Sequence, residues 1–538
     1  MTVKIDISPE QLAIVQGILK DHLPKGTLAW AFGSRVAWTA KPFSDLDIAL
    51  EGAAPLAPDV LIDLEEAFEA SDLPWKVDVI DLTAVSPEFR AIVERQRVPA
   101  DWQHMTFAEA GITLLDCDHK TPAAQQSGRP YVGIPQITTG RVDFASARKI
   151  SEADFITWTR KTKYQKDDVI LSRRTNPGVT AVDDTGTEFA LGQNLVLLRA
   201  DGTKVFPPFL RWIVHSPAWW VEIEKYLNVG AVFSSLRCGD VPKFEFSFPP
   251  TWEQEDIARI LRALDDKIEL NRRMNETLEA MARAVFRDWF VDFGPTRRKA
   301  AGITDPAAIL GGLLPDPEKA APLVALFPDS FGDNGLPEGW EERPFVGFLD
   351  IIGGGTPKTK VPEYWGGKVP WFSVVDTPPT GGVFVWNTEK TITERGVAES
   401  SVRMIDAGTT IISARGTVGN IAMAARPMTF NQSCYALRAV EPVGDIFVYL
   451  ATERMVERLK AMAHGSVFST ITRATFESLN FAWAGEDVFT AFERLIEPMF
   501  ELIKANGQEN QTLAATRDLL LPKLMSGDLR LTGAEDVV

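Results

Sequence analysis

The chain has 538 residues, which is too many for a single hydrophobic core, so several domains are expected. Its hydrophobic fraction of 45% and charged fraction of 24% are those of an ordinary globular protein, and no apolar run reaches the roughly 18 residues of a membrane-spanning helix. The net charge of −17 argues against a generally basic nucleic-acid binder, although a DNA-binding surface needs only a local basic patch. The N-terminus does not resemble a signal peptide, and three scattered cysteines cannot form a disulfide framework, so we expect a cytoplasmic protein.

The first hundred residues have the pattern of a small α/β domain, which we place at 1–100. The segment SPEQ at 8–11 offers a Ser cap, a Pro at the first helical position and a Gln three residues after the cap, which is typical of a helix start. A second helix is expected at 58–70 and a third from Ser86. Strands are expected at 27–34, 45–50 and 75–82.

Three aspartates of this domain are candidate metal ligands. Asp45 and Asp47 are two positions apart on one expected strand, so both point to the same face, and Asp78 on a later strand could complete the cluster. Mg²⁺ prefers such oxygen ligands and needs only a few from the protein. Asp81 has the opposite strand parity from Asp78 and is excluded. Exposed acidic residues at strand ends are common, so Asp45 and Asp47 alone would be weak evidence for a metal site.

A small-residue turn, Gly33-Ser34, ends the first expected strand, where free backbone N–H groups could hold a phosphate. The pattern GSRVAWTAKPFSDLDIAL followed by KVDVIDL resembles the minimal (MNT-like) nucleotidyltransferases over about residues 5–97. The resemblance implies that Gly33 and Ser34 bind nucleotide phosphates and that the three aspartates bind Mg²⁺, so Mg²⁺ and a nucleoside triphosphate are the expected cofactors. The sequence departs from the family at Ala37-Trp38, where members often carry Arg-Gly, and a Trp beside the phosphate turn could obstruct a nucleotide.

The rest of the chain contains an internal repeat, with halves at 101–250 and 338–485. Each half consists of short β-rich segments with Gly and Pro turns, and the matched segments occur in the same order, which indicates a duplication. The matched pairs are RPYVGIPQITTGRVDF (129–144) with VPWFSVVDTPPTGGVF (369–384), VILSRRTNPGVTAV (169–182) with TIISARGTVGNIAM (410–423), and GAVFSSL (230–236) with GSVFSTI (465–471).

A long helix is expected after each half, at 251–294 and 486–532. Apolar residues alternate at spacings of three and four, from Ile257, which matches Phe492, to Trp289, which matches Leu524; this is the seam of a coiled-coil helix. Residues 295–337 are rich in Pro, Gly and Ala, and we interpret them as a linker with one short helix.

The order of these parts, the LFPDSF…LPEGW junction, the repeated GxVFSxx stretch and the terminal LLLPKLMSGDLRL resemble the specificity (S) subunit of type I restriction–modification enzymes, a phage-defence system, over about residues 101–532. The resemblance implies two target-recognition domains that each read one half of a split double-stranded DNA target. It also implies that the two helices form an antiparallel coiled-coil spacer and dock methyltransferase (M) and restriction (R) subunits, which carry S-adenosylmethionine and ATP.

The expected fold is therefore a multidomain α+β protein. An N-terminal α/β nucleotidyltransferase-like domain precedes two β-rich target-recognition domains, each followed by a long helix. The specificity portion is expected to have no catalytic residue and no cofactor of its own.

Reading bases requires side chains that donate to or accept from base edges, with further cations on phosphates. Residues expected to be exposed and unmatched between the halves, such as Arg173 and Lys358, are better candidates for specificity than shared ones such as Arg174 and Arg415, which could equally be structural. The candidates are Arg173, Arg174, Gln193, Asn194 and Arg237 in the first half, and Lys358, Arg415, Asn431, Gln432, Ser469, Thr470 and Arg473 in the second.

The repeat predicts a register for the two helices. At about 1.5 Å per residue, a helix of about 38 residues is about 57 Å long, which exceeds one DNA turn of about 34 Å. If the halves are related by a pseudo-twofold axis, the helices are antiparallel, and Asn271 faces Asn510 while Asn275 faces Asn506. We expect these asparagines to fix the register and thus the spacer length.

Two other functions remain open on sequence grounds. The chain could be a nucleotidyltransferase or antitoxin-type enzyme whose duplicated part serves only as a targeting or assembly scaffold. Alternatively, it could be a structural adaptor whose helices only assemble partner proteins.

Overall fold

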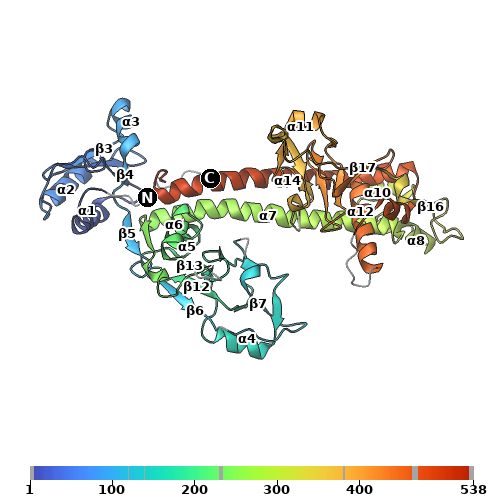
Figure 1. The fold of residues 1–538 in the computed structure, drawn as a ribbon, viewed down its shortest axis with the longest axis horizontal. Helices are drawn as coiled ribbons and strands as arrows, with labels where there is room; N and C mark the ends of the chain where they lie inside the picture. Colours follow the sequence, from blue (N-terminus) through green and yellow to red (C-terminus); the bar gives the residue numbers. More distant parts are fainter. Residues whose placement is uncertain are drawn as a thin grey trace. The chain divides into compact units, whose positions relative to one another are not determined.

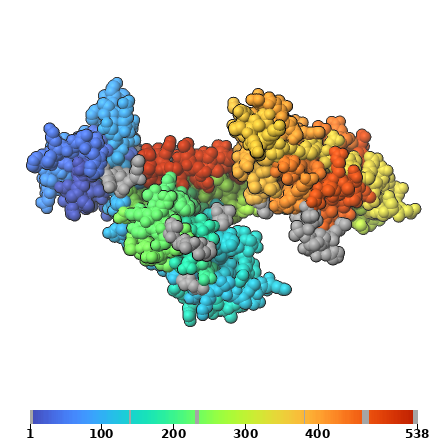
Figure 2. All heavy atoms as spheres, in the orientation of Figure 1, coloured from blue at the N-terminus to red at the C-terminus, as the bar shows by residue number. Residues whose placement is uncertain are grey.

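The computed structural model describes residues 5–118, 120–137, 140–229, 234–379, 382–462 and 470–531. It contains two compact units, one formed by 1–264 with 515–538 and the other by 265–514 (Figure 1). Each long helix contributes one end to the first unit and the rest to the second. Part of the C-terminal helix, drawn in red, is open to solvent on the face shown in Figure 2. Within these ranges no helix is both long and apolar enough to cross a membrane.

The N-terminal part of the first unit is a four-stranded sheet with helices, in the strand order β3-β2-β1-β4. Strands β2 and β3 are parallel, whereas β1 is antiparallel to both of its neighbours. The Ser8 hydroxyl accepts a hydrogen bond from the Gln11 backbone N–H, and the Ser8 backbone N–H donates to the Gln11 side-chain oxygen, which confirms the predicted capping box. The elements are α1 Pro9–His22, β1 Leu28–Phe32, β2 Leu46–Glu51, α2 Pro58–Glu69, β3 Val77–Asp81, α3 Pro87–Gln96 and β4 Val98–Pro99.

The first repeated module follows in the same unit and has a core of three small sheets, ordered β10-β9-β12-β6, β11-β7-β8 and β15-β5. Ile257 and Leu261 of α7 (Thr251–Phe290) and Leu521 and Leu524 of α14 (Glu486–Ser526) are buried in its core, so the ends of both long helices belong to it. Its elements are β5 Gln103–Thr106, β6 Ile112–Asp116, β7 Arg129–Val132, β8 Arg148–Ile150, α4 Glu152–Thr159, β9 Val169–Ser172, β10 Thr180–Ala181, β11 Ala190–Leu191, β12 Leu195–Ala200, α5 Pro207–Ile213, α6 Pro217–Tyr226, β13 Asn228–Val229, β14 Ser234–Ser235, β15 Glu245–Phe248 and α7 Thr251–Phe290.

The second module lies in the second unit and repeats the topology of the first. Four strands of a five-stranded sheet, β22-β21-β24-β17, match β10-β9-β12-β6, and β19 adds a further strand beside β22. The sheet β23-β18-β20 matches β11-β7-β8, and β25-β16 matches β15-β5. In both modules the pair β7–β11 or β18–β23 is parallel. The predicted duplication is thus visible in the order of the strands. The elements are β16 Glu341–Pro344, β17 Leu349–Gly353, β18 Trp365–Phe372, β19 Phe384–Val385, β20 Thr391–Ile392, α11 Glu394–Ala398, β21 Thr410–Ser413, β22 Ile421–Ala424, β23 Thr429–Phe430, β24 Cys434–Ala439, α12 Asp445–Met462, α13 Arg473–Glu477, β25 Asn480–Trp483 and α14 Glu486–Ser526.

The segment between α7 and the second module differs from the predicted linker with one short helix. It forms three helices, α8 Gly294–Ala300, α9 Pro306–Ile309 and α10 Pro317–Val324, and each has a Pro in its first turn. Ile309, Leu310 and Phe327 of the segment are buried in the core of the second unit, and several leucines pack against it, whereas Ile303 is exposed. The segment is therefore a packed part of the fold, despite its Pro- and Gly-rich composition.

Candidate functional site

The turn after β1 is shaped by Gly33, whose φ of 75° lies in the left-handed region that favours glycine. A Cβ atom at this position would collide with the carboxylate of Asp47 on the neighbouring strand β2. The missing side chain thus lets the backbone of the turn pass directly over Asp47. A phosphate bound to this turn would lie beside the acidic residues of the domain.

The acidic cluster is centred on Asp47. Asp47 and Asp78 are register partners on the parallel strands β2 and β3, and Asp45 immediately precedes β2, although we expected it within the strand. Burial raises the pKa of the Asp47 carboxyl, and the charges of Asp78 and Asp45 raise it further. The three carboxylates therefore share one electrostatic environment, as a site for a divalent cation requires.

Lys76 modifies this cluster. Its Nζ lies 2.6 Å from Oδ1 of Asp78, and this exposed hydrogen bond raises the pKa of the lysine. In the described part of the chain, no three Asp, Glu, His or Cys side chains already converge on one metal position. The aspartates thus have the donor chemistry that Mg²⁺ prefers, but Asp78 forms an ion pair with Lys76.

Two further residues lie close to this turn in sequence: Arg35, which was not assigned a role from sequence, and Trp38, which was expected to obstruct a nucleotide. Arg35 is buried and donates to the backbone oxygens of Ser44 and Asp6, so it braces the loop between β1 and β2. Trp38 has a left-handed φ of 57° and is 59% exposed, so its ring is not packed in the interior. Asp81 accepts hydrogen bonds from Leu56 and Thr83, a structural role that agrees with its exclusion from the metal site.

In the first module, three segments that contain candidate DNA-contacting residues meet at the end of β9. The backbone N–H of Arg173 donates to the oxygen of Asn194, and Leu236 donates to the oxygen of Arg173. Arg174 forms an isolated bridge with Ser235. We define this group of Arg173, Arg174, Gln193, Asn194 and Arg237 as the first recognition edge.

The side chains of the first recognition edge differ in exposure. Arg174, Gln193 and Arg237 are exposed. Arg173 was expected to be exposed, and this is wrong: its side chain is only 11% exposed, and its Nε has no hydrogen-bond partner among the described residues. Asn194 has a left-handed φ of 71° and shapes the turn before β12.

The second module brings together the equivalent segments after β21. Arg415 bridges Thr470 as Arg174 bridges Ser235, so these backbone positions are a structural feature of both modules. Ala414 donates to the oxygen of Ser433, and Ile471 donates to the oxygen of Ala414. We define Arg415, Asn431, Gln432, Thr470 and Arg473 as the second recognition edge; Ser469 lies outside the described residues.

Several side chains of the second recognition edge have partners within the protein. Asn431 accepts from the Ser433 backbone, and Arg473 donates to the backbone oxygen of Ile351. Thr356 donates to Gln432, which brings the loop containing the exposed Lys358 close to this edge. Arg415, Gln432 and Thr470 remain exposed.

In the second unit, the long helices are antiparallel and their asparagines pair as the repeat predicts. Asn271 donates to Oδ1 of Asn510 over 2.9 Å, and Asn506 donates to Oδ1 of Asn275 over 2.9 Å. Asn275 and Asn506 are 5% and 7% exposed. Asn271 also donates to Glu509, which in turn pairs with Lys267. The coiled-coil packing of the full seam stays a prediction.

Comparison with known proteins relates these features to two families. The family described as "Type I restriction modification DNA specificity domain" matches residues 116–280 and 337–482. The family described as "Polymerase beta, Nucleotidyltransferase" matches residues 15–98. The two matches lie in separate parts of the chain.

Individual relatives agree with these matches. The type I restriction enzyme HindI specificity subunit of Haemophilus influenzae is 26% identical over 421 residues, which cover 71% of this chain and 90% of that protein. The probable protein adenylyltransferase MntA of the same organism is 47% identical over 92 residues, which cover 17% of this chain and 80% of that protein. The crystal structure of the S subunit of a type I restriction–modification system from M. genitalium is 16% identical with a TM-score of 0.46, covering 79% of this chain and 96% of that one.

Proposed function

We propose, from the premise that this chain belongs to the family of type I restriction–modification specificity subunits, that each of its two modules reads one half of a split DNA target. The observation that carries the proposal is the recurrence of one topology in both modules, with polar and basic segments meeting at the same place. Arg, Asn, Gln and Thr side chains are those that read base edges. The protein then acts beside DNA in the cytoplasm.

The division of the chain supports a complex in which catalysis belongs to partners. We place the target-recognition domains at 101–250 and 338–485 and the spacer helices at 251–294 and 486–532. In this proposal the helices dock the methyltransferase and restriction subunits, which bring S-adenosylmethionine and ATP. The recognition edges contain donors and acceptors for DNA, and no step of catalysis is assigned to them.

Mapping of methylated bases in cells that express this subunit with its methyltransferase tests the proposal. We expect one consensus made of two half-sites with a fixed spacing. A contiguous consensus would contradict two-module reading. Methylation without sequence preference would leave only the structural adaptor, in which the helices assemble partners without selecting DNA.

A second function is proposed for residues 1–100, because residues 15–98 match a nucleotidyltransferase family and the chain is similar to MntA over 92 residues. Gly33 and Ser34 would hold the nucleotide phosphates, and Asp45, Asp47 and Asp78 would hold Mg²⁺. When bound, the cation would neutralise charge on the triphosphate. The close approach of Gly33 to Asp47 favours this function, because it places the turn next to the carboxylate of Asp47.

Incubation of the full chain with labelled ATP and Mg²⁺ tests this second function. We expect label transfer by the wild type and none by Asp45→Ala/Asp47→Ala. The control is Asp63→Ala/Glu66→Ala, which removes two charges from exposed positions of α2. Equal label in the wild type and the site variant would reject nucleotidyl transfer at this site.

A further inference from the structure

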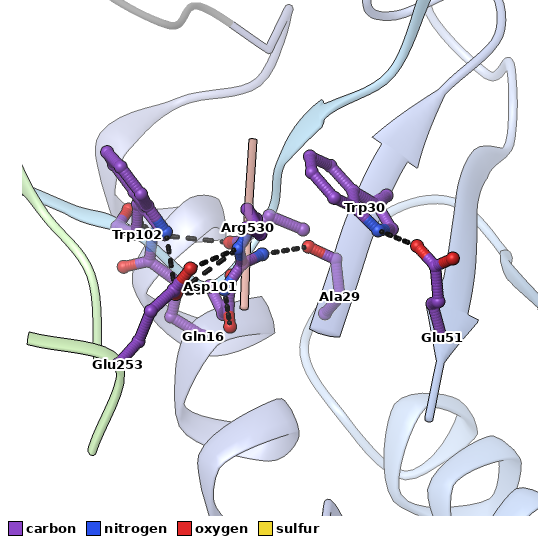
Figure 3. A network of polar contacts seen from close by, with 9 residues as sticks. Gln16, Ala29, Trp30, Glu51, Asp101, Trp102, Glu253 and Arg530 are labelled. Atoms are coloured by element: carbon purple, nitrogen blue, oxygen red, sulfur yellow. Dashed lines mark hydrogen bonds and ion pairs between the residues drawn. The ribbon is translucent and has the colours of Figure 1, made fainter. Parts of the chain in front are cut away.

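A buried arginine near the end of the chain joins distant parts of the first unit (Figure 3). Arg530 follows α14 by four residues, and its side chain is completely buried. It donates to both oxygens of Asp101 at 2.7 and 2.8 Å, to Glu253 at 2.6 to 3.2 Å, and to the backbone oxygen of Ala29 at 3.0 Å. Ala29 lies on β1, and Glu253 lies in the first turn of α7.

All five N–H groups of the guanidinium have a partner in this network. Nε donates to Glu253, one terminal nitrogen to Ala29 and Asp101, and the other to Asp101 and Glu253. A buried charge is stable only when it is paired and hydrogen-bonded in this way. A lysine offers three donors without the planar fork, so the surroundings fit arginine specifically.

Aromatic rings enclose the network on the side of the N-terminal domain. The guanidinium carbon lies 5.1 Å from the ring centre of Trp30 and 5.9 Å from that of Trp102. Trp102 also donates to Glu253 at 3.2 Å, and Gln16 of α1 donates to the Trp102 backbone oxygen at 2.6 Å. The network therefore contacts the sheet and a helix of the N-terminal domain.

Gly527 directs the end of the chain into this position. Its φ is 78°, and a Cβ here would lie 2.5 Å from Cγ of Pro99. Leu529 donates to the oxygen of Lys523, which turns the chain back at the end of α14. The chain can thus follow the surface next to β4 only with glycine at this point.

We infer that residues 527–531 are an intramolecular clamp that fixes the N-terminal domain to the adjoining ends of α7 and α14. The C-terminal segment of the same chain thus occupies the surface formed by Ala29, Asp101 and Glu253. The N-terminal domain is then an integral part of the specificity subunit rather than a tethered attachment. Because β1 contains Ala29 and Trp30 and ends at Phe32, directly before Gly33, the clamp holds the strand that leads to the turn proposed to bind phosphate.

Hydrogen–deuterium exchange of the full chain tests the clamp in Arg530→Gln. Amides of residues 28–34 and 99–103 should exchange at least about tenfold faster than in the wild type, because local opening sets the exchange rate. Exchange in β16 and β25 of the second unit should not change. Lys523→Gln is the matched control, since it removes an exposed cation from the same end of α14. Equal exchange in all three proteins would overturn the inference.

Gly527→Ala provides a second variant that keeps every charge of the network. The added methyl group would collide with Pro99, so the same amides should exchange faster in Gly527→Ala than in the wild type. This variant tests the clamp even if Arg530→Gln does not fold. Unchanged exchange in folded Gly527→Ala would also contradict the clamp. Any effect of the two variants on nucleotidyl transfer rests on the proposed function, so label transfer from ATP is measured separately. Absence of labelled product from all proteins would reject that function alone, because the exchange rates report the clamp independently.

Discussion

Asn506 donates a hydrogen bond of 2.9 Å to Asn275, and the two side chains are almost completely buried between antiparallel helices. Asn275 additionally donates to the backbone oxygen of Ile503 at 3.3 Å. A shift along either helix would separate these groups and leave buried amides without partners. Such a penalty favours one register, although the pair is less stabilising than apolar residues would be.

Replacement of all four paired asparagines by Leu should therefore keep the fold and relax the register. We expect equal or higher resistance to urea, by up to about 3 kcal/mol for the apolar surface that becomes buried. The selectivity for one half-site spacing should decrease, as measured by binding to DNA targets that differ only in spacer length. Unchanged spacing selectivity would reject the role of these residues in setting the spacer.

The buried pair should contribute more to this effect than the partly exposed one. Asn510 is less buried than Asn275 and Asn506, and Asn271 divides its donors between Asn510 and Glu509. Asn275→Leu/Asn506→Leu should therefore loosen the spacing preference more than Asn271→Leu/Asn510→Leu. The two double variants serve as controls for each other in the same binding series.

Arg237 is expected to affect only one half of the DNA target. Its side chain is exposed at the first recognition edge, and the matching position of the second module is not an arginine. Arg237→Ala should weaken binding by about 1–3 kcal/mol if it contacts a base, and it should relax one half-site only. Selection from random DNA in the presence of the methyltransferase measures both effects.

The salt dependence of DNA binding by Arg237→Ala distinguishes a base contact from a phosphate contact. If Arg237 contacts a phosphate, binding weakens similarly for all sequences, and the salt slope falls by about 1. Arg160→Ala is the control, because Arg160 is an exposed arginine of the same module outside the recognition edge. A loss confined to the second half-site would contradict the assignment of Arg237 to the first module.

The features predicted correctly from sequence are those with a local or repeated signal. Ser8 and Ser86 begin helices because capping depends on neighbouring residues alone. The asparagine pairing follows from the duplication, since a pseudo-twofold relation places each position opposite its counterpart. The similar sheet orders have the same origin, because matched segments with the same apolar pattern form matched strands.

The features that sequence did not reveal depend on distant contacts. Arg530, Glu253 and Asp101 meet although hundreds of positions separate them, and nothing near Arg530 marks it as buried. Arg173 and Arg174 have the same local pattern, and only the surrounding sheets determine that Arg173 is enclosed. The helices at 294–324 are short and Pro-rich, so periodicity did not distinguish them from a linker.

The second unit should become less stable as the pH rises, because of Glu493. Its carboxylate accepts from the Phe447 N–H at the start of α12, and burial raises its pKa to about 7. Nearby Asp445 and Glu497 add to this rise. A raised pKa means that the folded state favours the protonated acid. The associated stability is therefore fully present below the ordinary value of about 4.5 and is lost as the pH increases to about 7.

The free energy of unfolding should decrease by up to about 3 kcal/mol between these pH values. It can be measured from urea unfolding at pH 5 and pH 8. Glu493→Gln should remove most of the difference, because the amide keeps a hydrogen-bond acceptor and does not ionise. Glu501→Gln, at an exposed position of α14, should retain it. The same pH difference in wild type and Glu493→Gln would contradict this origin.

Lys76 should compete with a divalent cation for Asp78. The lysine lies 2.6 Å from Oδ1 of Asp78, so binding of Mg²⁺ by the three aspartates requires this ion pair to open. Lys76→Met should therefore lower the Mn²⁺ concentration needed for half-maximal binding, measured by the paramagnetic signal of free Mn²⁺ with the full chain. Lys20→Met, in the last turn of α1, is the control for loss of an exposed cation.

The pH dependence of this binding adds a test that concerns Asp47. Burial and the neighbouring carboxylates raise the pKa of Asp47, so protons compete with the metal at a higher pH than for an ordinary aspartate. Mn²⁺ affinity should fall as the pH is lowered through this raised pKa, and Asp47→Asn should abolish both binding and its pH dependence. Stronger binding in Lys76→Met that persists in Lys76→Met/Asp47→Asn would place the metal elsewhere.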